Sequence, residues 1–271
     1  NLQFVGDTDN GSVVNLANRT ITVDLDPGEN ITVTFTNTQR GGITVIKNAI
    51  PDSAQDFSYS GTLPAFSLDD DADPTLLNTA VFSNLTPGSY TISEAQVVGW
   101  DLTNLQFVGD TDNGSLVNLA TRTITVDVDP GENITVTFTN TQRGGITVIK
   151  NAIPDGPQDF SFSGTLPVFS LDDDADPTLS NTALFSNLTP GSYTITANVN
   201  APSEAANSFF VDIDNEPRDP AMIWDAPVTS GFESRTVSWR GNGTFDNPQY
   251  APAVFNLSAG THQLIVRGRE G

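Results

Sequence analysis

Two lysines carry the most specific chemistry in this sequence. They are the only lysines of the chain, and each ends a copy of the octapeptide Arg-Gly-Gly-Ile-Thr-Val-Ile-Lys, at Lys47 and Lys150. Strand alternation places Lys47 on the same face as Ile43 and Val45, which we expect to be the core face. A lysine in an apolar site needs a partner or loses its proton, and the neutral amine is a nucleophile.

Two more polar residues are expected to face the same core. Glu94 shares its face with Ile92, and Asn140 shares its face with Phe138. An apolar site would raise the pKa of Glu94, so that a protonated carboxyl could polarise the Asn140 amide. Two simpler alternatives remain. One is a buried ion pair of Lys47 and Glu94 beside a hydrogen-bonded Asn140, and the other is a pair of lysines that reach solvent at a strand end.

An acidic loop suggests a different chemistry, the binding of a cation. Clustered carboxylates suit Ca²⁺, and the chain repeats one such cluster: Asp69, Asp71 and Asp73, then Asp172, Asp174 and Asp176. The EF-hand pattern fails, because Pro74 stands where its glycine belongs and Ala80 where its glutamate belongs. We therefore expect no cofactor, and calcium is the alternative to a solvated acidic turn. Asp7 and Asp9 form a weaker candidate.

Aromatic residues near the C-terminus raise the question of sugar binding. Trp224, Trp239 and Tyr250 could stack on a sugar ring, and the alternative is that they belong to the core. His262 is the only histidine, and the sequence contains no phosphate-binding loop. We predict that the protein is not an enzyme.

The composition narrows the class of protein. A net charge of -22 over 271 residues argues against nucleic acid and against docking on anionic lipid. The sequence has no cysteine and no long apolar run, so disulfides are excluded and membrane insertion is not expected. Abundant Thr, Asn, Ser and Gly favour strands joined by polar turns. We expect a secreted, cell-surface protein.

The elements that must position these residues come from a repeat of 103 residues. Residues 1–93 recur as 104–196 with ten differences. Alternating stretches flank Asp26-Pro-Gly-Glu29 and Leu85-Thr-Pro-Gly-Ser89, which predicts two hairpins in each repeat. About seven short strands per repeat predict an all-β fold of tandem immunoglobulin-like sandwiches. A β-rich segment that does not share the repeated sequence follows them.

Four motifs together resemble one family. They are Gly42-Ile-Thr-Val-Ile-Lys47, Phe66-Ser-Leu-Asp-Asp-Asp71, Phe82-Ser-Asn-Leu-Thr-Pro-Gly-Ser-Tyr-Thr-Ile-Ser-Glu94 and Thr135-Val-Thr-Phe-Thr-Asn140. They resemble the prealbumin-like, collagen-adhesin B-type repeat of bacterial surface proteins and pilins. The resemblance implies an intramolecular isopeptide bond between Lys47 and Asn140, assisted by Glu94. It also implies that 40–142 is a complete sandwich, 1–39 the rear part of another, and 143–196 the front part of a third.

The second copy departs from this pattern. Ala197 replaces Glu94, and the acceptor for Lys150 would have to be Asn37 of another chain. Residues 197–271 resemble the later half of a carbohydrate-binding jelly roll, so we expect a separate jelly-roll-like segment there.

These observations lead to a structural role. The two partial sandwiches would complete each other between chains, and such a contact propagates into a fibre. We therefore expect a subunit of an extracellular fibre or stalk, polymerised head to tail with copies of itself by strand complementation between 143–196 and 1–39. One alternative is a window cut from a longer array. Others are an adhesin with a C-terminal glycan-binding head, and the noncatalytic region of an extracellular enzyme.

Overall fold

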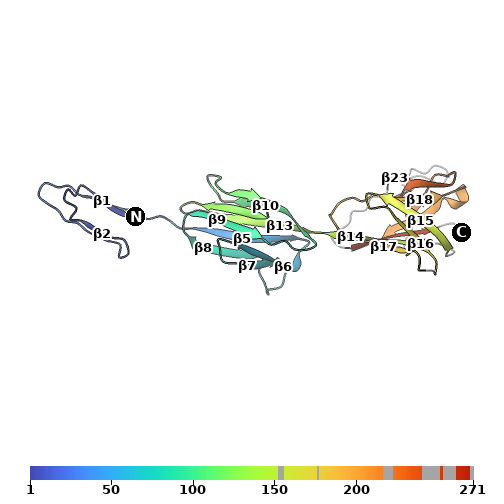
Figure 1. The fold of residues 1–271 in the computed structure, drawn as a ribbon, viewed down its shortest axis with the longest axis horizontal. Coiled ribbons are helices and arrows are strands. Elements are labelled where there is room, and N and C mark those ends of the chain that lie inside the picture. The colour runs from blue at the N-terminus through green and yellow to red at the C-terminus, as the bar shows by residue number, and fades with distance from the viewer. Residues whose placement is uncertain (152–155, 176, 216–221, 240–250, 253–260, 269–271) are drawn as a thin grey trace.

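The computed structural model describes residues 1–151, 156–175, 177–215, 222–239, 251–252 and 261–268. Figure 1 shows three groups of strands that follow one another along the chain. We name them the N-terminal segment (residues 1–39), the middle sandwich (residues 41–142) and the C-terminal sandwich (strands between residues 144 and 268). The predicted all-β fold of tandem sandwiches is confirmed.

The middle sandwich consists of two sheets. Its strands are β5 (Gly41–Ile50), β6 (Ser53–Gly61), β7 (Phe66–Asp70), β8 (Thr79–Leu85), β9 (Gly88–Glu94), β10 (Trp100–Val108), β11 (Leu116–Asn118), β12 (Thr123–Val128) and β13 (Asn133–Gln142). One sheet has the order β10-β13-β5-β8, and the other has the order β11-β12-β9-β6-β7. Their facing sides bury an apolar core that includes Val45, Phe57 and Phe138.

The predicted hairpins are wrong, although the strands themselves exist. β8 and β9 flank the turn after Leu85, yet they belong to opposite sheets, and so do β12 and β13. Each turn therefore carries the chain across the core instead of folding it back beside itself. The alternating pattern marks which side chains of a strand are buried. It does not identify the strand's neighbour, because strands of either sheet turn alternate side chains into the same core.

One contact between strands is central to the site. β5 pairs in parallel with β13, and Lys47 lies opposite Phe138 in the register. Parallel neighbours need a long connection, and here β6 to β12 supply it. The first and last strands of the sandwich thus meet in the middle of one sheet.

The C-terminal sandwich repeats this arrangement. Its strands are β14 (Gly144–Asn151), β15 (Gly156–Gly164), β16 (Phe169–Asp173), β17 (Thr182–Leu188), β18 (Ile195–Asn200), β19 (Ser208–Ile213), β20 (Ile223–Asp225), β21 (Phe232–Thr236) and β24 (Thr261–Gly268). The sheets have the orders β17-β14-β24-β19-β20 and β16-β15-β18-β21. A further strand pair, β22 (Ser238–Trp239) and β23 (Ala251–Pro252), and a 3-10 turn, η1 (Glu204–Ala206), lie in the same part of the chain.

The structure differs here from the predicted division at residue 196. β24 pairs in parallel with β14 as β13 does with β5, and β21 pairs with β18 as β12 does with β9. Residues 197–268 thus supply the closing strands of the sandwich that 143–196 opens, instead of forming a separate jelly-roll-like segment. The prediction failed because the closing strands no longer share the sequence of the repeat, although apolar residues such as Val211 and Leu264 still pack in the core.

Arg143 lies between the two complete sandwiches and contacts both. Its Nε and Nη2 donate to the Asp101 carboxylate at 2.9 and 2.7 Å, and its Nη1 donates to the Asn187 carbonyl at 3.4 Å. Its backbone N–H donates to the Gly99 carbonyl at 2.8 Å. One side chain thus ties the end of the middle sandwich to the start of the next.

The N-terminal segment has only short strand pairs among the described residues. β1 (Leu2–Val5) pairs with β4 (Thr32–Phe35), and β2 (Val13–Asn15) pairs with β3 (Thr20–Thr22). These pairs repeat the registers of β10 with β13 and β11 with β12. No helix of the described residues is long and apolar enough to cross a membrane.

Candidate functional site

The first candidate site is the inside of the middle sandwich, at Lys47. β5 alternates as the sequence predicts, so Ile43, Val45 and Lys47 all point into the core, and the lysine is only 1% exposed. Its Nζ lies 3.0 Å from Asn140 Oδ1 and 3.3 Å from the Phe138 carbonyl oxygen, and donates to the Asn48 carbonyl at 2.9 Å. The same Nζ lies 4.1 Å from the centre of the Phe57 ring.

Glu94 reaches the same point from the opposite sheet. Its Oε2 accepts hydrogen bonds from Asn140 Nδ2 at 3.0 Å and from Arg122 Nη2 at 2.8 Å. Its Oε1 accepts one from the Tyr59 hydroxyl at 3.3 Å. Asn140 is fully buried, and the Glu94 side chain is 0% exposed. The structure therefore brings together the three residues that the sequence placed in one site.

Sequence reasoning missed Tyr59 and Arg122. Tyr59 lies on β6 directly across from Glu94 in the strand register. Arg122 adopts a positive φ of 58° at the turn before β12, and its backbone carbonyl accepts the Glu94 N–H at 3.0 Å. The sequence held a signal for both, because Tyr59 becomes Phe162 in the copy that lacks the glutamate, and Arg122 is a rare cation in an acidic chain.

Burial controls the electrostatics of this site. Desolvation lowers the pKa of Lys47 to about 8, against the opposing attraction of Glu94 and Asp70. Desolvation also raises the pKa of Tyr59, so its hydroxyl remains a donor to Glu94. A lysine with such a pKa has a sizeable neutral fraction near physiological pH. An amine in that state is a nucleophile without further activation.

The arrangement positions each group for an amide exchange. The lysine nitrogen lies beside the carbonyl end of the Asn140 amide, and Glu94 lies beside its nitrogen end. We expected a neutral Glu94 carboxyl, but all three of its contacts here are as an acceptor, one of them from a guanidinium. Such a carboxylate is suited to take a proton from the amine and return it to the departing nitrogen.

The C-terminal sandwich has lost most of this site. Lys150 is half-buried, and its Nζ lies 4.3 Å from the Phe160 ring centre. Desolvation lowers its pKa, and Asp173 opposes that shift. Ala197 stands where Glu94 does, opposite Phe162 instead of a tyrosine. The register of β14 with β24 places Val266 opposite Lys150.

Two positions complete the comparison of the two sandwiches. Counting along β24, Gly268 falls at the place of Asn140. Arg235 falls at the place of Arg122, where it pairs with Glu233. The C-terminal sandwich therefore keeps the lysine and the arginine without the carboxylate or the amide.

The predicted crosslink between Lys150 and Asn37 of another chain is wrong on geometric grounds. It required an open edge beside β14, where a strand carrying Asn37 could lie. β14 has β17 on one side and β24 on the other. The same finding removes the basis for strand complementation between 143–196 and 1–39.

The predicted calcium loop uses its carboxylates internally. Asp71 Oδ1 accepts the Asp73 N–H at 2.8 Å, and Asp73 Oδ1 accepts the Thr75 N–H at 2.7 Å. Asp69 is buried, with its pKa raised by desolvation and by neighbouring aspartates. In the second copy Asp172 is buried and Asp174 is half-buried, whereas Asp176 lies outside the described residues.

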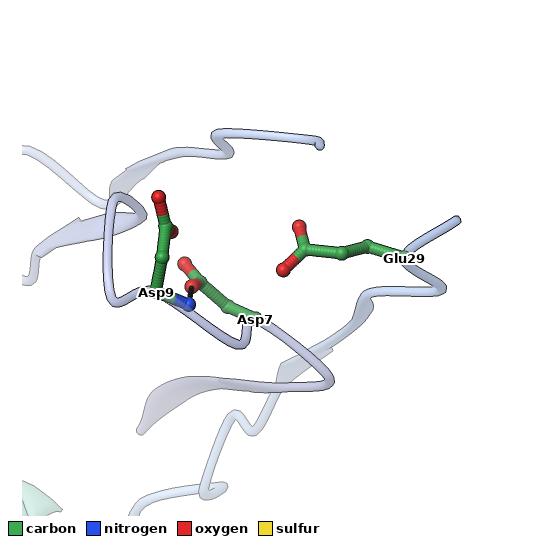
Figure 2. A group of neighbouring side chains, drawn as sticks. All are labelled: Asp7, Asp9 and Glu29. Atoms are coloured by element: carbon green, nitrogen blue, oxygen red, sulfur yellow. Dashed lines mark hydrogen bonds between the residues drawn. The ribbon is translucent and has the colours of Figure 1, made fainter. Parts of the chain in front are cut away.

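A different acidic group meets the geometry of a cation site. Asp7, Asp9 and Glu29 each place an oxygen within 4.8 Å of the others, and Figure 2 draws these three side chains. These carboxylates already hold the loop together, since Asp7 accepts the Ser12 N–H at 2.7 Å and Glu29 accepts the Thr8 N–H at 2.7 Å. Hydrogen bonding lowers the pKa of Asp7 to about 2. The cluster is accounted for as a turn that fixes its own backbone.

Of the three aromatic candidates for sugar stacking, the structure describes the side chain of Trp224. Trp224 is 1% exposed and packs with Phe209 in the core, so it is not available to a ligand. Trp239 belongs to β22, and its side chain lies outside what the structure describes. Tyr250 lies outside the described residues. The core alternative is therefore the correct one for Trp224.

The comparisons with solved structures give distant likenesses. The Bacillus anthracis TIE protein shares 14% identity with a TM-score of 0.29, over 99% of this chain and 58% of its own. The major pilin T-13 of Streptococcus pyogenes shares 10% identity with a TM-score of 0.25, over 87% of this chain and 98% of its own. The pilus adhesin SpaC of Lactobacillus rhamnosus GG shares 15% identity with a TM-score of 0.26, over 96% of this chain and 32% of its own.

The sequence comparisons are more specific. No curated protein matches the chain. The model of the prealbumin-like fold domain matches residues 43–142, which run from the first strand of the middle sandwich to the last. This match makes residues 43–142 similar to the prealbumin-like fold domain family, over the stretch that contains the paired sheets and the parallel contact of β5 with β13.

Proposed function

We propose that the protein is a structural component of an extracellular fibre or stalk, whose middle sandwich is locked by an isopeptide bond between Lys47 and Asn140. The observation that carries the proposal is the buried contact of 3.0 Å between Lys47 Nζ and the Asn140 amide, with Glu94 3.0 Å from the other end of that amide. A buried lysine that served only packing would need none of this alignment.

The reaction follows from the positions of the three groups. The neutral Lys47 amine attacks Asn140 Cγ, and the Nζ–Cγ bond forms as the Cγ–Nδ2 bond breaks. Glu94 carries the proton from the amine to Nδ2, which leaves as ammonia. Tyr59 and Arg122 hold the carboxylate in place, and the apolar core keeps water away from the intermediate.

A bond at this place has a clear mechanical use. It would join the first and last strands of the sandwich, which are neighbours in the same sheet and 93 residues apart at the two side chains. A pull on the two ends of the sandwich would then load a covalent bond before the sheets separate. This is the property that a stalk of tandem sandwiches needs, and it supports a structural role at the cell surface.

Mass spectrometry tests the proposal directly. The intact chain should be lighter than its sequence by one ammonia. Acylated Lys47 also resists trypsin, so the digest should contain the fragment 41–122 joined to 123–143. The matched control is Lys150→Arg, which should leave the loss of mass unchanged, whereas Lys47→Arg and Asn140→Ala should abolish it. A full sequence mass in the folded chain would refute the crosslink.

A further inference from the structure

Arg122 contacts Glu94 twice, once through its backbone and once through its side chain. Its carbonyl oxygen accepts the Glu94 N–H at 3.0 Å, and its Nη2 donates to Glu94 Oε2 at 2.8 Å. The Arg122 side chain is only 18% exposed, so the two sheets shield most of this ion pair from water. One residue therefore holds both the strand end and the carboxylate of the crosslinking site.

Two features of Arg122 are unfavourable for the fold. Its φ of 58° lies in the left-handed region, which residues other than glycine, asparagine and aspartate seldom adopt. Its Nε is buried without a hydrogen-bond partner among the described residues, which also costs free energy. Neither feature explains why an arginine stands at this turn, whereas its contact with Glu94 does.

The C-terminal sandwich shows what an arginine at this position does without the glutamate. Arg235 falls at the place of Arg122 and forms an ion pair with Glu233 on its own strand. In the middle sandwich Ala120 stands at the place of Glu233. Arg122 therefore has no acidic residue two positions away that would compete with Glu94 for its guanidinium.

We propose that Arg122 is a positioning residue of the crosslinking reaction, because its guanidinium keeps Glu94 in the ionised form that can accept a proton. This inference rests on the proposed function. The Lys47 amine forms its bond with Asn140 only when a base is present to take its proton. By keeping that base ionised in acid, Arg122 widens the pH range in which the bond forms.

The other titratable groups around Glu94 do not supply this charge. The Tyr59 hydroxyl on β6 donates to Oε1 and remains protonated, since burial raises its pKa. Desolvation lowers the pKa of Lys47 on β5 to about 8, so its positive charge is lost as it becomes reactive. Asp70 on β7 attracts Lys47 but carries the same charge as Glu94. The Arg122 guanidinium stays charged throughout this pH range.

The proton transfer explains why the charge of Glu94 matters. The Nζ–Cγ bond forms between Lys47 and Asn140, and the amine proton passes to Glu94. Glu94 Oε2 already accepts a hydrogen bond from Asn140 Nδ2 at 3.0 Å. The proton can therefore move on to Nδ2 as the Cγ–Nδ2 bond breaks and ammonia leaves. A neutral Glu94 could not accept the first proton, and Arg122 takes no part in the bonds that change.

The pH dependence of the rate separates this role from a purely structural one. In the wild-type chain only the Lys47 ammonium must lose a proton, so the rate should rise about tenfold per pH unit below the pKa of about 8. In Arg122→Met the buried carboxyl has lost its counter-charge and takes up a proton in acid. Two protons must then be lost, and the rate in acid should rise by up to about 100-fold per pH unit. The two rates should converge at alkaline pH.

The test uses the full chain before it has folded, recovered in guanidinium at its full sequence mass. The chain is diluted into buffers from pH 5 to pH 9, and mass spectrometry of timed samples follows the loss of one ammonia. Near-ultraviolet circular dichroism reports whether each variant folds. The matched control is Arg235→Met, which removes the corresponding arginine of the C-terminal sandwich and should leave both the rate and its slope against pH unchanged.

Two further variants separate the charge of Arg122 from its shape. Arg122→Lys keeps a cation beside Glu94 and should restore the wild-type slope. Arg122→Gln is neutral but can still donate a hydrogen bond to Glu94, and it should show the steeper slope of Arg122→Met. It also provides the same measurement if the methionine variant does not fold.

Three results would overturn the inference. They are a rate of the neutral variants that falls by one factor at every pH, a slope that stays at the wild-type value, and a faster reaction of these variants in acid. The last result would mean that neutral Glu94 is the active form. A wild-type chain that keeps its full sequence mass at every pH would instead refute the proposed function itself.

Discussion

The two lysines allow one substitution to be compared in two nearly identical strands. Lys47→Met and Lys150→Met each replace a buried or half-buried cation by an apolar chain of similar length. If Lys47 is bonded to Asn140, its substitution opens a covalent loop of 93 residues. Lys150 has Val266 as its neighbour on β24 and no glutamate at position 197, so its substitution opens no loop.

The two substitutions should have different effects on the free energy of unfolding of their sandwiches. Loss of a loop of that length costs about 4.7 kcal/mol by the chain-entropy estimate for crosslinks. Lys47→Met should therefore lower the free energy of unfolding of the middle sandwich by about 5 kcal/mol. Lys150→Met should leave the C-terminal sandwich as stable as before or more stable, because it removes the desolvation of an ammonium.

Fluorine NMR of 5-fluorotryptophan can follow the two sandwiches separately. Trp100 is buried against Phe57 in the middle sandwich, and Trp224 is buried in the C-terminal one. Guanidinium titrations read at these two resonances give a midpoint for each sandwich in the same sample. A loss of only about 1–3 kcal/mol at Trp100 in Lys47→Met would indicate hydrogen bonds alone. That result would refute the loop-closure reasoning.

Three other predictions concern pH and the junction. Because burial lowers the pKa of Lys47 to about 8, ammonia release from newly synthesised chain as it first folds should be about tenfold faster at pH 7 than at pH 6 and should level off above pH 9. Mass spectrometry of timed samples measures this, and a pH-independent rate would contradict it. Burial also lowers the pKa of Lys150 below 10.5, so the unfolded chain binds more protons near that pH. The Trp224 midpoint should therefore rise as the pH approaches 10.5, and Lys150→Met should remove that rise. Arg143→Gln breaks a pair with Asp101 whose side chains are 37% and 32% exposed, so neither midpoint should move measurably. Small-angle scattering should nevertheless change, and an identical profile would mean that Arg143 does not fix the junction.

The sequence by itself determined the inward face of each strand. Alternation turned Lys47, Glu94 and Asn140 toward the core, and all three are buried there. The repeat fixed the length of one sandwich, and the departure at Ala197 marked the copy that lacks the site. These inferences succeeded because the side chains of a strand alternate between its two faces, so the local sequence is enough to predict which of them are buried.

Only the tertiary structure decided which strands are neighbours. The turn after Leu85 joins opposite sheets, and β24 closes a sandwich that the sequence left open at residue 196. Pairing of this kind depends on contacts between residues far apart in the chain, and many strands with the same alternation could take the same place. Arg122 joined the site for the same reason, since only the packing of two sheets brings that turn to Glu94.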